Sequence, residues 1–431
     1  MNNQSMMMGM LIKKYRIEQN MSQESLCQGI CAVSYLSKIE KGSVSCSDEI
    51  LHQLMDVLGI DLNHNPGKIK MLKEAIDHFY RSYFLHKQEE IQRWMDLLNE
   101  EQELLQHSSL AIDYMLIQGL FGLTRIRFLD EDPQGFKNRI YELLDYVSYM
   151  SPSQTHLTHY LIGYYEMIHH SDFKKALLQF QRSARIKQDG IILEALASAN
   201  YNLGNYAESI RLGDLAYKQL MEEGYLERGI EVNFVIAAAY ANVKDIDNML
   251  TYYQRLLTLN EQSSNSREAF VYYNIGSTYL AVRNYQEAKQ HLEKSYAAYH
   301  KEDSVGSDKF YVLQKLALVA YGQQNYDLAT TYTKELLEIY DRIKHQRLEP
   351  SMKVCLDWLI TLCIKKETLE SETSVEILRK LYKQARKDSH HGFQTFYGDY
   401  LIEALKAQHK YKEALKITEE IYVKWKLSSN L

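Results

Sequence analysis

Proline and glycine are scarce in this chain of 431 residues, which holds 4 of the first and 19 of the second. Because these residues make most tight turns, their scarcity favours helices over β-sandwiches and barrels. No segment reaches the roughly 18 consecutive apolar residues that a membrane-spanning helix needs, so none is expected. The opening residues MNNQSMMMGM contain neither a basic segment nor an apolar core, which predicts no signal peptide.

An excess of positive charge is also absent. The formal net charge is −6, so the chain as a whole is not drawn to nucleic acid, and any DNA-binding role must come from a local surface. The cysteines are odd in number and none belongs to a CxxC pair, which indicates free thiols in a reducing cytoplasm. They are Cys27, Cys31, Cys46, Cys355 and Cys363.

The common sequence motifs of enzymes and of cofactor-binding proteins are missing. There is no P-loop, G-x-S-x-G, H-E-x-x-H or Rossmann glycine run, so the sequence predicts neither an enzyme nor a cofactor. His156 and His159 have a spacing that could ligate a metal, but no cysteine or carboxylate partner is evident. We therefore expect these two histidines to pack, and we predict no metal site.

Helical periodicity is what the sequence does contain, with one clear break at DLNHNPGK (61–68). The break predicts a small helical domain over 1–62, a linker over 63–68 and a second domain over 69–431. Directly after it, the segment 69–105 has apolar residues at helical spacing without proline or glycine, which predicts one or two long amphipathic helices.

Short motifs of one kind recur along the second domain: DFKKA, NYAES, DIDNM, NYQEA, NYDLA and KYKEA. Their second residues are 33, 40, 39, 41 and 85 positions apart, and the last spacing indicates a degenerate unit in between. They are Phe173, Tyr206, Ile246, Tyr285, Tyr326 and Tyr411.

The clearest copy, NIGSTYLAVRNYQEA, places Gly276, Tyr279, Tyr285 and Ala288 at the spacing of a tetratricopeptide repeat (TPR). A small residue lets the first helix approach the second, an aromatic residue fills the elbow, and the alanine packs the second helix back. One such hairpin cannot bury its apolar face alone, so stacking is expected to build a right-handed superhelix with a concave inner surface. The alternative is a helical bundle without repeats.

The first domain contains the unit SQESLCQGICAVSYLSKIEKG (22–42). Ser22 is a good N-cap for a helix over about 23–28, and Gly42 is expected to end a second helix over about 34–41. Leu11, Ile12 and Tyr15 of a preceding helix are available for the core. A closing helix carries Leu51, Leu54, Val57 and Leu58 on one apolar stripe.

This unit is either a helix-turn-helix that binds DNA or an ordinary helical hairpin. The second helix leaves small hydroxyls, a tyrosine and lysines outward, which suits contacts to base edges and phosphates in a major groove. A glutamine at the N-terminus of the first helix suits a phosphate. Residues 1–62 hold five Lys/Arg against seven Asp/Glu, so a dimer that reads two half-sites is expected. The predicted DNA-binding residues are Gln23, Ser34, Tyr35, Ser37, Lys38 and Lys41.

The stretches MSQESLCQGICAVSYLSKIEKG and LMDVLGI resemble the Cro/repressor-like (XRE) helix-turn-helix. Together with the TPR-like remainder, they resemble the peptide-pheromone regulators called RRNPP, of the Rgg, PlcR, NprR and PrgX kind. That resemblance implies an all-α, cytoplasmic transcription regulator encoded by a bacterium or a phage. It also implies a homodimer that binds a double-stranded DNA operator and is switched by a short signalling peptide.

Aligning the repeats on their aromatic residues predicts which side chains face the concave surface. One stripe runs through Arg267, Phe270, Asn274, Ser277 and Ala281, and the preceding copy through Arg228, Glu231, Val235, Ala238 and Asn242. Asparagine can hold a peptide backbone through its donor and acceptor, and arginine can hold a carboxylate. The predicted peptide-binding residues are Asn202, Arg228, Asn242, Arg267, Asn274 and Lys315.

Each of these residues could instead have no role in ligand binding and be solvated or cap a neighbouring helix. Tyr165, Tyr201 and Tyr321 lie at or beside the same stripe and are expected to pack in elbows. Two other functions are also open. One is an adaptor whose TPR surface sequesters a signalling protein, as Rap members do, and the other is a repressor that needs no peptide.

Overall fold

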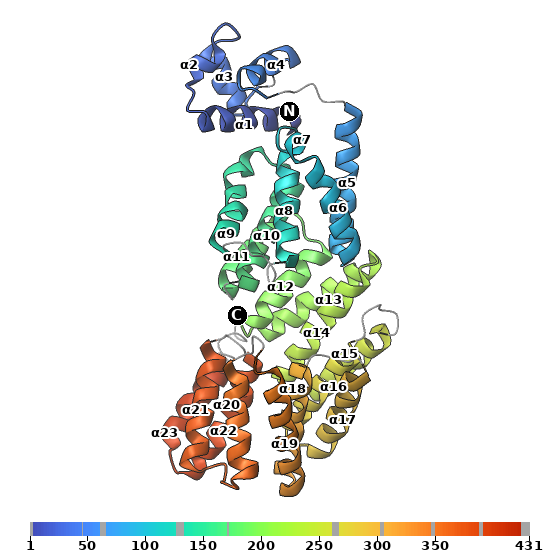
Figure 1. Ribbon diagram of the computed structural model, residues 1–431, viewed down its shortest axis with the longest axis vertical. Coiled ribbons are helices and arrows are strands. Elements are labelled where there is room, and N and C mark those ends of the chain that lie inside the picture. Colours follow the sequence, from blue (N-terminus) through green and yellow to red (C-terminus); the bar gives the residue numbers. More distant parts are fainter. Residues whose placement is uncertain are drawn as a thin grey trace. The chain divides into compact units, whose positions relative to one another are not determined.

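The computed structural model has helices as the regular secondary structure of the residues it describes. These are 3–44, 46–60, 66–125, 133–169, 172–260, 267–301, 306–345, 350–387 and 391–423. The predicted all-α fold, a helix-turn-helix followed by stacked TPR-like pairs, is confirmed (Figure 1). The chain divides into two compact units, 1–195 and 196–431, which are described separately. No helix in the described ranges is both long and apolar enough to cross a membrane.

The first unit opens with the helix-turn-helix. Ser22 accepts a hydrogen bond from the Ser25 N–H, so the predicted N-cap is confirmed. Gly42 has φ of +64°, and the N–H groups of Gly42 and Ser43 donate to Ile39 and Lys38, which confirms the predicted helix stop. The four helices are α1 (Asn3–Glu18), α2 (Gln23–Cys27), α3 (Val33–Glu40) and α4 (Asp48–Val57).

The core of this small domain forms largely where the apolar pattern predicts, although Tyr15 and Leu51 are only half-buried. Leu11, Ile12, Leu26, Leu36 and Ile39 are buried, as expected. The prediction that Val57 shares the apolar stripe of α4 is wrong, because its side chain is 47% exposed. The buried residues at the C-terminal end of α4 are instead Leu54, Met55 and Leu58. Val57 lies two residues, or about 200° of helical turn, beyond Met55 and therefore faces solvent.

The segment after the linker forms three helices rather than one or two. His86 has φ of +59°, and the Lys87 N–H bonds back to the Ser82 carbonyl, so the chain turns without glycine or proline. Part of the predicted linker is helical, since α5 begins at Pro66, and 61–65 lie outside the described residues. The three helices are α5 (Pro66–Phe84), α6 (Gln88–Glu100) and α7 (Gln102–Gln106).

The remainder of the first unit packs around α8. Gly119 and Gly122 let α8 approach its neighbours, because a Cβ at either position would overlap Leu161 or Phe136. The helices are α8 (Ala111–Arg125), α9 (Pro133–Glu142), the 3₁₀-helix η1 (Leu143–Tyr149), α10 (Pro152–His169), α11 (Phe173–Ile186) and α12 (Gly190–Asn202), in which the division between units falls.

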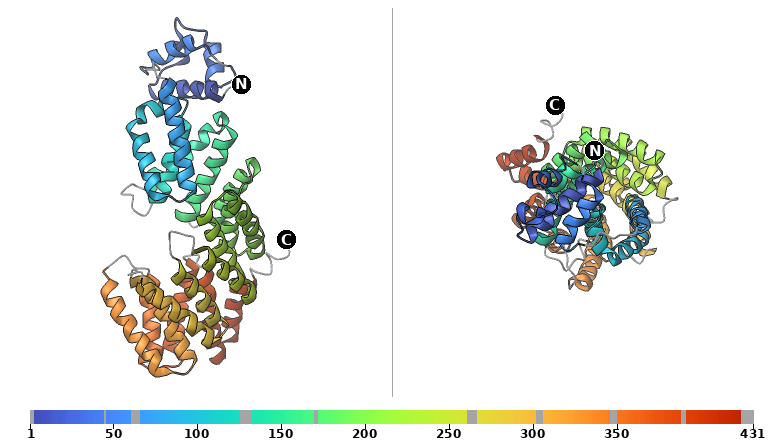
Figure 2. Two further views of the ribbon diagram at one scale, coloured as in Figure 1. Left: turned by 90° about the vertical axis from the view of Figure 1, so that its right-hand side faces the viewer. Right: turned by 90° about the horizontal axis from the view of Figure 1, so that it is seen from above.

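The second unit is a series of helix pairs in which each helix packs against the next (Figure 1). In the left view of Figure 2 the yellow-to-orange helices run side by side as such pairs. The helices are α13 (Tyr206–Glu222), α14 (Leu226–Asn242), α15 (Ile246–Asn260), α16 (Glu268–Ala281), α17 (Tyr285–Lys301), α18 (Gly306–Gly322), α19 (Tyr326–Ile343), α20 (Pro350–Leu359), the π-helix η2 (Ile360–Ile364), α21 (Glu372–Lys387), α22 (His391–Ala407), α23 (Tyr411–Thr418) and the π-helix η3 (Glu419–Val423).

One turn recurs between the helices of each pair. A residue with positive φ is followed by an N–H that bonds back five residues, and in four of the five cases the positive-φ residue is not glycine. Lys366 also has positive φ, between η2 and α21, so the predicted degenerate unit is present there. The recurring positions are Gly204, Lys244, Arg283, Gln324 and His409.

The best repeat packs as its residues predict. A Cβ at Gly276 would lie 2.7 Å from Leu292 Cγ, so only glycine allows this approach of α16 to α17, and Ala288 is fully buried. The expectation that every motif aromatic fills an elbow is wrong for Tyr326 and Tyr411, which are largely exposed. Tyr326 instead meets the edge of the Tyr321 ring in the preceding helix.

Candidate functional site

A groove with a volume of about 570 Å³ opens in the second unit. Most of its lining comes from α14, α16 and α18, the first helices of three successive pairs, and from α22 near the C-terminus, and Tyr201 of α12 and Tyr253 of α15 complete it. The lining is mostly apolar and aromatic, with a few polar groups. It comprises Tyr201, Phe234, Val235, Ala238, Ala241, Asn242, Lys244, Tyr253, Phe270, Tyr273, Asn274, Ser277, Thr278, Ala281, Val282, Tyr311, Lys315, Gly392, Phe393, Thr395, Phe396 and Asp399.

The structure brings together three of the six residues predicted to bind a peptide. Asn242, Asn274 and Lys315 line the groove. Most of the other stripe positions predicted from the repeat alignment also line it, namely Val235, Ala238, Phe270, Ser277 and Ala281. The side chains of this surface therefore come from the positions that the repeat register indicates.

The other three predicted residues, Asn202, Arg228 and Arg267, do not line the groove. Arg228 is buried, and Arg267 lies 3.3 Å from Glu227 and 3.6 Å from Glu231. Burial raises the pKa of the Glu231 carboxyl, and the two arginines oppose that rise. The charges of both arginines thus act on carboxylates of the protein itself.

The predicted asparagines share one conformation. In each, the side-chain Nδ2 donates to the carbonyl four residues earlier at 2.8 Å, to Ser198, Ala238 and Phe270 respectively. Asn242 Nδ2 also lies 3.4 Å from the Tyr201 hydroxyl. The hydrogen bond to the carbonyl four residues earlier fixes each side-chain amide against its own helix. In Asn242 and Asn274, the amide carbonyl is left as an acceptor beside the groove.

Lys315 is the most unusual group in the groove. It is only 2% exposed, and its Nζ lies 3.0 Å from the centroid of the Phe396 ring and 5.8 Å from that of Phe393. Burial lowers the pKa of its ammonium group to about 7, although the charge interaction with Cys355 acts in the opposite direction. The hydroxyl oxygen of Ser277, in the same lining, is buried without a hydrogen-bond partner among the described residues.

Sequence reasoning missed the wall that α22 supplies. Phe393 and Phe396 line the groove, while Tyr397 and Tyr400 of the same helix are buried. Two ion pairs join α22 to the recurring turns: Lys244 to Asp399 at 3.8 Å, and Arg283 to Glu403. The aromatic residues in HGFQTFYGDY stand at helical spacing, so a signal for a packed helix was present. Its position opposite α16 and α18 depends on tertiary structure.

The predicted DNA-binding residues gather on α2 and α3. Ser34, Lys38 and Lys41 are exposed, whereas Tyr35 and Ser37 are half-buried. Gln23 Nε2 donates to Glu40 at 2.7 Å, and Arg16 pairs with the same carboxylate at 2.6 Å. This network ties α1, α2 and α3 together and leaves the predicted DNA face of α3 open to solvent.

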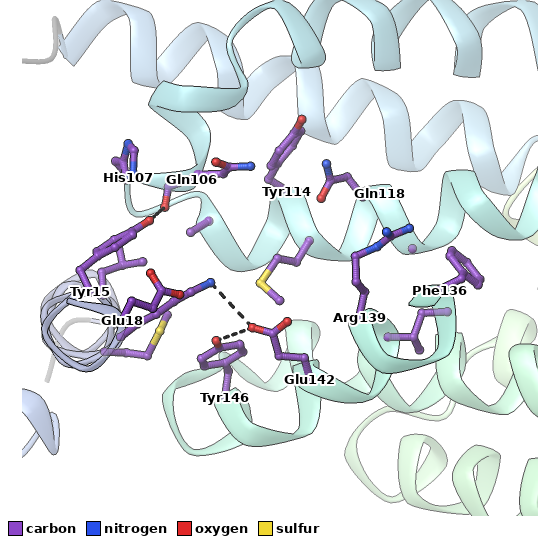
Figure 3. A pocket seen from close by; sticks show the side chains of 17 residues that line it. Tyr15, Glu18, Gln106, His107, Tyr114, Gln118, Phe136, Arg139, Glu142 and Tyr146 are labelled. Atoms are coloured by element: carbon purple, nitrogen blue, oxygen red, sulfur yellow. Dashed lines mark hydrogen bonds and ion pairs between the residues drawn. The ribbon is translucent and has the colours of Figure 1, made fainter. Parts of the chain in front are cut away.

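The helix-turn-helix rests on the neighbouring helices of the first unit around a cavity of about 330 Å³ (Figure 3). Tyr149 donates its hydroxyl to the Glu40 carbonyl at 3.0 Å, and Lys14 lies 3.7 Å from Glu142. Tyr15 donates to the Gln106 carbonyl at 3.3 Å, and burial raises the pKa of its phenol to about 12. These contacts hold the end of α3 and one face of α1.

His156 and His159, whose spacing could ligate a metal ion, form hydrogen bonds with other side chains of the protein. His156 Nδ1 lies 2.8 Å from the Ser183 hydroxyl, and its Nε2 lies 3.6 Å from Asp189. His159 Nδ1 lies 2.8 Å from Gln179. Hydrogen bonds and packing therefore account for both side chains.

Comparisons with known proteins identify two matched regions and one distant relative. Residues 12–64 match a family model described as helix-turn-helix, and residues 230–301 match one described as tetratricopeptide repeat. Over 419 residues the chain is 23% identical to the transcriptional activator NprA of Geobacillus stearothermophilus, covering 92% of this chain and 98% of NprA.

Three solved structures share the fold. A Rap protein complexed with competence and sporulation factor has a TM-score of 0.63 at 13% identity, covering 84% of this chain and 99% of that chain. The apo form of the quorum sensor NprR from B. thuringiensis has a TM-score of 0.62 at 15% identity, covering 82% and 99%. NprR in complex with its cognate peptide NprX has a TM-score of 0.57 at 14% identity, covering 81% and 98%. Together with NprA, these matches confirm the resemblance to RRNPP regulators.

Proposed function

We propose that this chain is a quorum-sensing transcription regulator. It binds operator DNA as a homodimer through α2 and α3, and a short signalling peptide bound in the groove of the second unit switches it. The observation that carries the proposal is the open groove lined by Asn242, Asn274 and Lys315, in a chain whose helix-turn-helix leaves Ser34, Lys38 and Lys41 exposed. Its distant relative NprA is a transcriptional activator, and NprR binds a cognate peptide.

Peptide recognition in this proposal is divided between backbone and side chains. The fixed amides of Asn242 and Asn274 hold the peptide main chain, and the aromatic walls select its side chains. Bound peptide shifts the protein between two arrangements only by its difference in affinity for them. That shift changes the spacing of the two helix-turn-helix units of a dimer and so changes operator affinity.

DNA binding is assigned to Gln23, Ser34, Tyr35, Ser37, Lys38 and Lys41. The exposed lysines contact phosphates, and the hydroxyls of α3 contact base edges. Since residues 1–62 carry more acidic than basic side chains, the affinity of one copy is low, and two half-sites in a dimer supply the rest. The proposal places the protein in the cytoplasm of its host.

Operator binding by the full-length protein tests this assignment. We expect Lys38→Ala and Lys41→Ala each to weaken binding to a duplex selected from a random library, and each to reduce the salt slope of log affinity by about 1. Lys13→Ala is the matched control, because Lys13 is an exposed lysine of α1 and does not belong to the predicted DNA-reading helix. Equal effects of all three substitutions, measured by fluorescence anisotropy across a salt series, would refute the assignment of α3 as the DNA-reading helix.

A second candidate function is an adaptor that sequesters a signalling protein. The shared fold with a Rap protein is the observation that favours it. The two functions differ in what peptide binding does. A peptide that leaves operator affinity unchanged but releases a bound partner protein indicates the adaptor. Operator binding that is indifferent to every peptide indicates a repressor without a peptide ligand.

A further inference from the structure

Lys315 is a buried cation on the wall of an open groove. Among the residues that the structure describes, no carboxylate forms an ion pair with it and no acceptor forms a hydrogen bond with it; its ammonium group lies over the rings of Phe396 and Phe393. The neighbouring Asp399 is paired with Lys244. A ring face offsets only part of the hydration that a buried ammonium group loses. An anion that entered the groove would supply the missing partner.

The surroundings of Lys315 define what else that ligand carries. Aromatic side chains from six helices line the same groove, so the ligand needs a large apolar group beside its anion. The Ser277 hydroxyl and the Asn274 amide add hydrogen-bonding groups on α16. The rings are those of Tyr201, Phe234, Tyr253, Phe270, Tyr273, Tyr311, Phe393 and Phe396.

A carboxylate is the anion that fits these walls. A phosphate would bring two negative charges and a large hydration shell into a mostly apolar and aromatic lining that contains Asp399, whereas a carboxylate brings one charge. The last residue of a peptide carries a carboxylate and a side chain on the same Cα. It can therefore place its charge on Lys315 and its side chain among the rings.

We propose that Lys315 binds the C-terminal carboxylate of a peptide whose last residue is large and apolar, with that side chain packed among the aromatic walls. This deepens the proposed function and rests on it, because it assumes that the groove holds a peptide. An internal Asp or Glu could offer the same chemistry, and the experiment distinguishes the two sources.

The test uses full-length protein and two random heptapeptide libraries of the same composition, one ending in a free acid and one in an amide. Affinity selection with mass spectrometry should enrich peptides from the free-acid library with Leu, Ile, Met or Phe in last place. By calorimetry, we expect amidation of such a peptide to weaken binding at least tenfold. Lys315→Met should weaken the acid by a similar factor and leave the amide unchanged, while Lys334→Met, at an exposed lysine of α19, should change neither.

A measurement on the unaltered protein decides the matter should Lys315→Met fail to fold. Pairing with a carboxylate favours the ammonium form, so the free acid should bind with proton uptake at pH 8, seen as heats that depend on the buffer, and the amide should not. Equal affinity of acid and amide, or enrichment of internal Asp or Glu with no preference at the C-terminus, would overturn the assignment of Lys315. Failure of both libraries to yield any binder would instead overturn the proposed function.

Discussion

At the scale of single residues, Lys315 links stability to ligand binding. Its burial lowers the pKa of the ammonium group to about 7, whereas a lysine in an unfolded chain titrates near 10.4. Between these values the unfolded chain holds a proton that the folded protein does not, so the free energy of unfolding rises with pH in that window. Below pH 7 the folded protein bears the full cost of a buried charge.

Replacing this cation with an apolar side chain of similar length should therefore stabilise the unliganded protein. We expect Lys315→Met to raise the melting temperature most below pH 7 and to lose that advantage as the pH approaches 10. Cys355 is the titratable group that faces Lys315, and burial raises the pKa of its thiol to about 12, so it stays neutral in this range. Asp399 of the same groove is paired with Lys244.

Thermal unfolding at pH 6 and pH 9, with Lys334→Met as the control, measures this difference. A gain for Lys315→Met of about 1 kcal/mol or more at pH 6, shrinking at pH 9, is the expected pattern. A loss of stability at both values would mean that the ammonium group has a partner in solution.

Single residues also show how much of the groove could be predicted from the sequence. Repeat register alone placed Asn242, Asn274 and Lys315 on one surface, because the period of the repeats brings equivalent positions of successive helices side by side. The ring of Phe396 against Lys315 could not be predicted, since it comes from a helix 81 positions further along the chain. Pairing of Arg267 with acidic residues of α14 was equally invisible, because it depends on how two helix ends meet.

At the scale of elements, the recurring turn between paired helices holds the repeats in register. Its positive-φ position is filled by glycine at Gly204 but by larger residues at Lys244, Arg283, Gln324 and His409. Non-glycine residues in this conformation cost about 1–2 kcal/mol each. The aromatic residues of the repeat motifs predicted where these turns occur. The positive φ itself could not be predicted at most of them, because the residue that adopts it is not glycine, and the same holds for His86.

Gln323 and Gln324 offer a matched pair for testing this cost. Gln324 has φ of +61°, while the Gln323 N–H still bonds to the Val319 carbonyl in a helical manner. We expect Gln324→Gly to stabilise the protein by about 0.5–1 kcal/mol and Gln323→Gly to destabilise it by a similar amount. Chemical denaturation followed by circular dichroism measures both. Equal destabilisation by the two substitutions would contradict the assigned turn.

At the scale of the whole molecule, the proposed function requires the groove of the second unit to influence the helix-turn-helix of the first. Within the first unit, Tyr149 and Lys14 hold the helix-turn-helix against the neighbouring helices, so α3 is not attached by a free linker alone. The domain order was predictable from motifs at either end of the chain. The contacts that seat the helix-turn-helix were not, because they pair residues about a hundred positions apart.

Linkage makes the proposed switch measurable from either side. If the peptide changes operator affinity by some factor, the operator must change peptide affinity by the same factor. A tenfold change corresponds to a coupling free energy of about 1.4 kcal/mol. The direction of the change distinguishes a peptide that promotes DNA binding from one that releases it.

The most direct measurement is the affinity of full-length protein for a selected operator duplex, with and without a saturating concentration of a peptide obtained by affinity selection. We predict at least a tenfold change in operator affinity for the natural chain. The same peptide at the same concentration should have little effect on Asn242→Ala/Asn274→Ala, whose operator affinity without peptide should be normal. Operator affinity that stays the same in the natural chain with peptide bound would contradict the account.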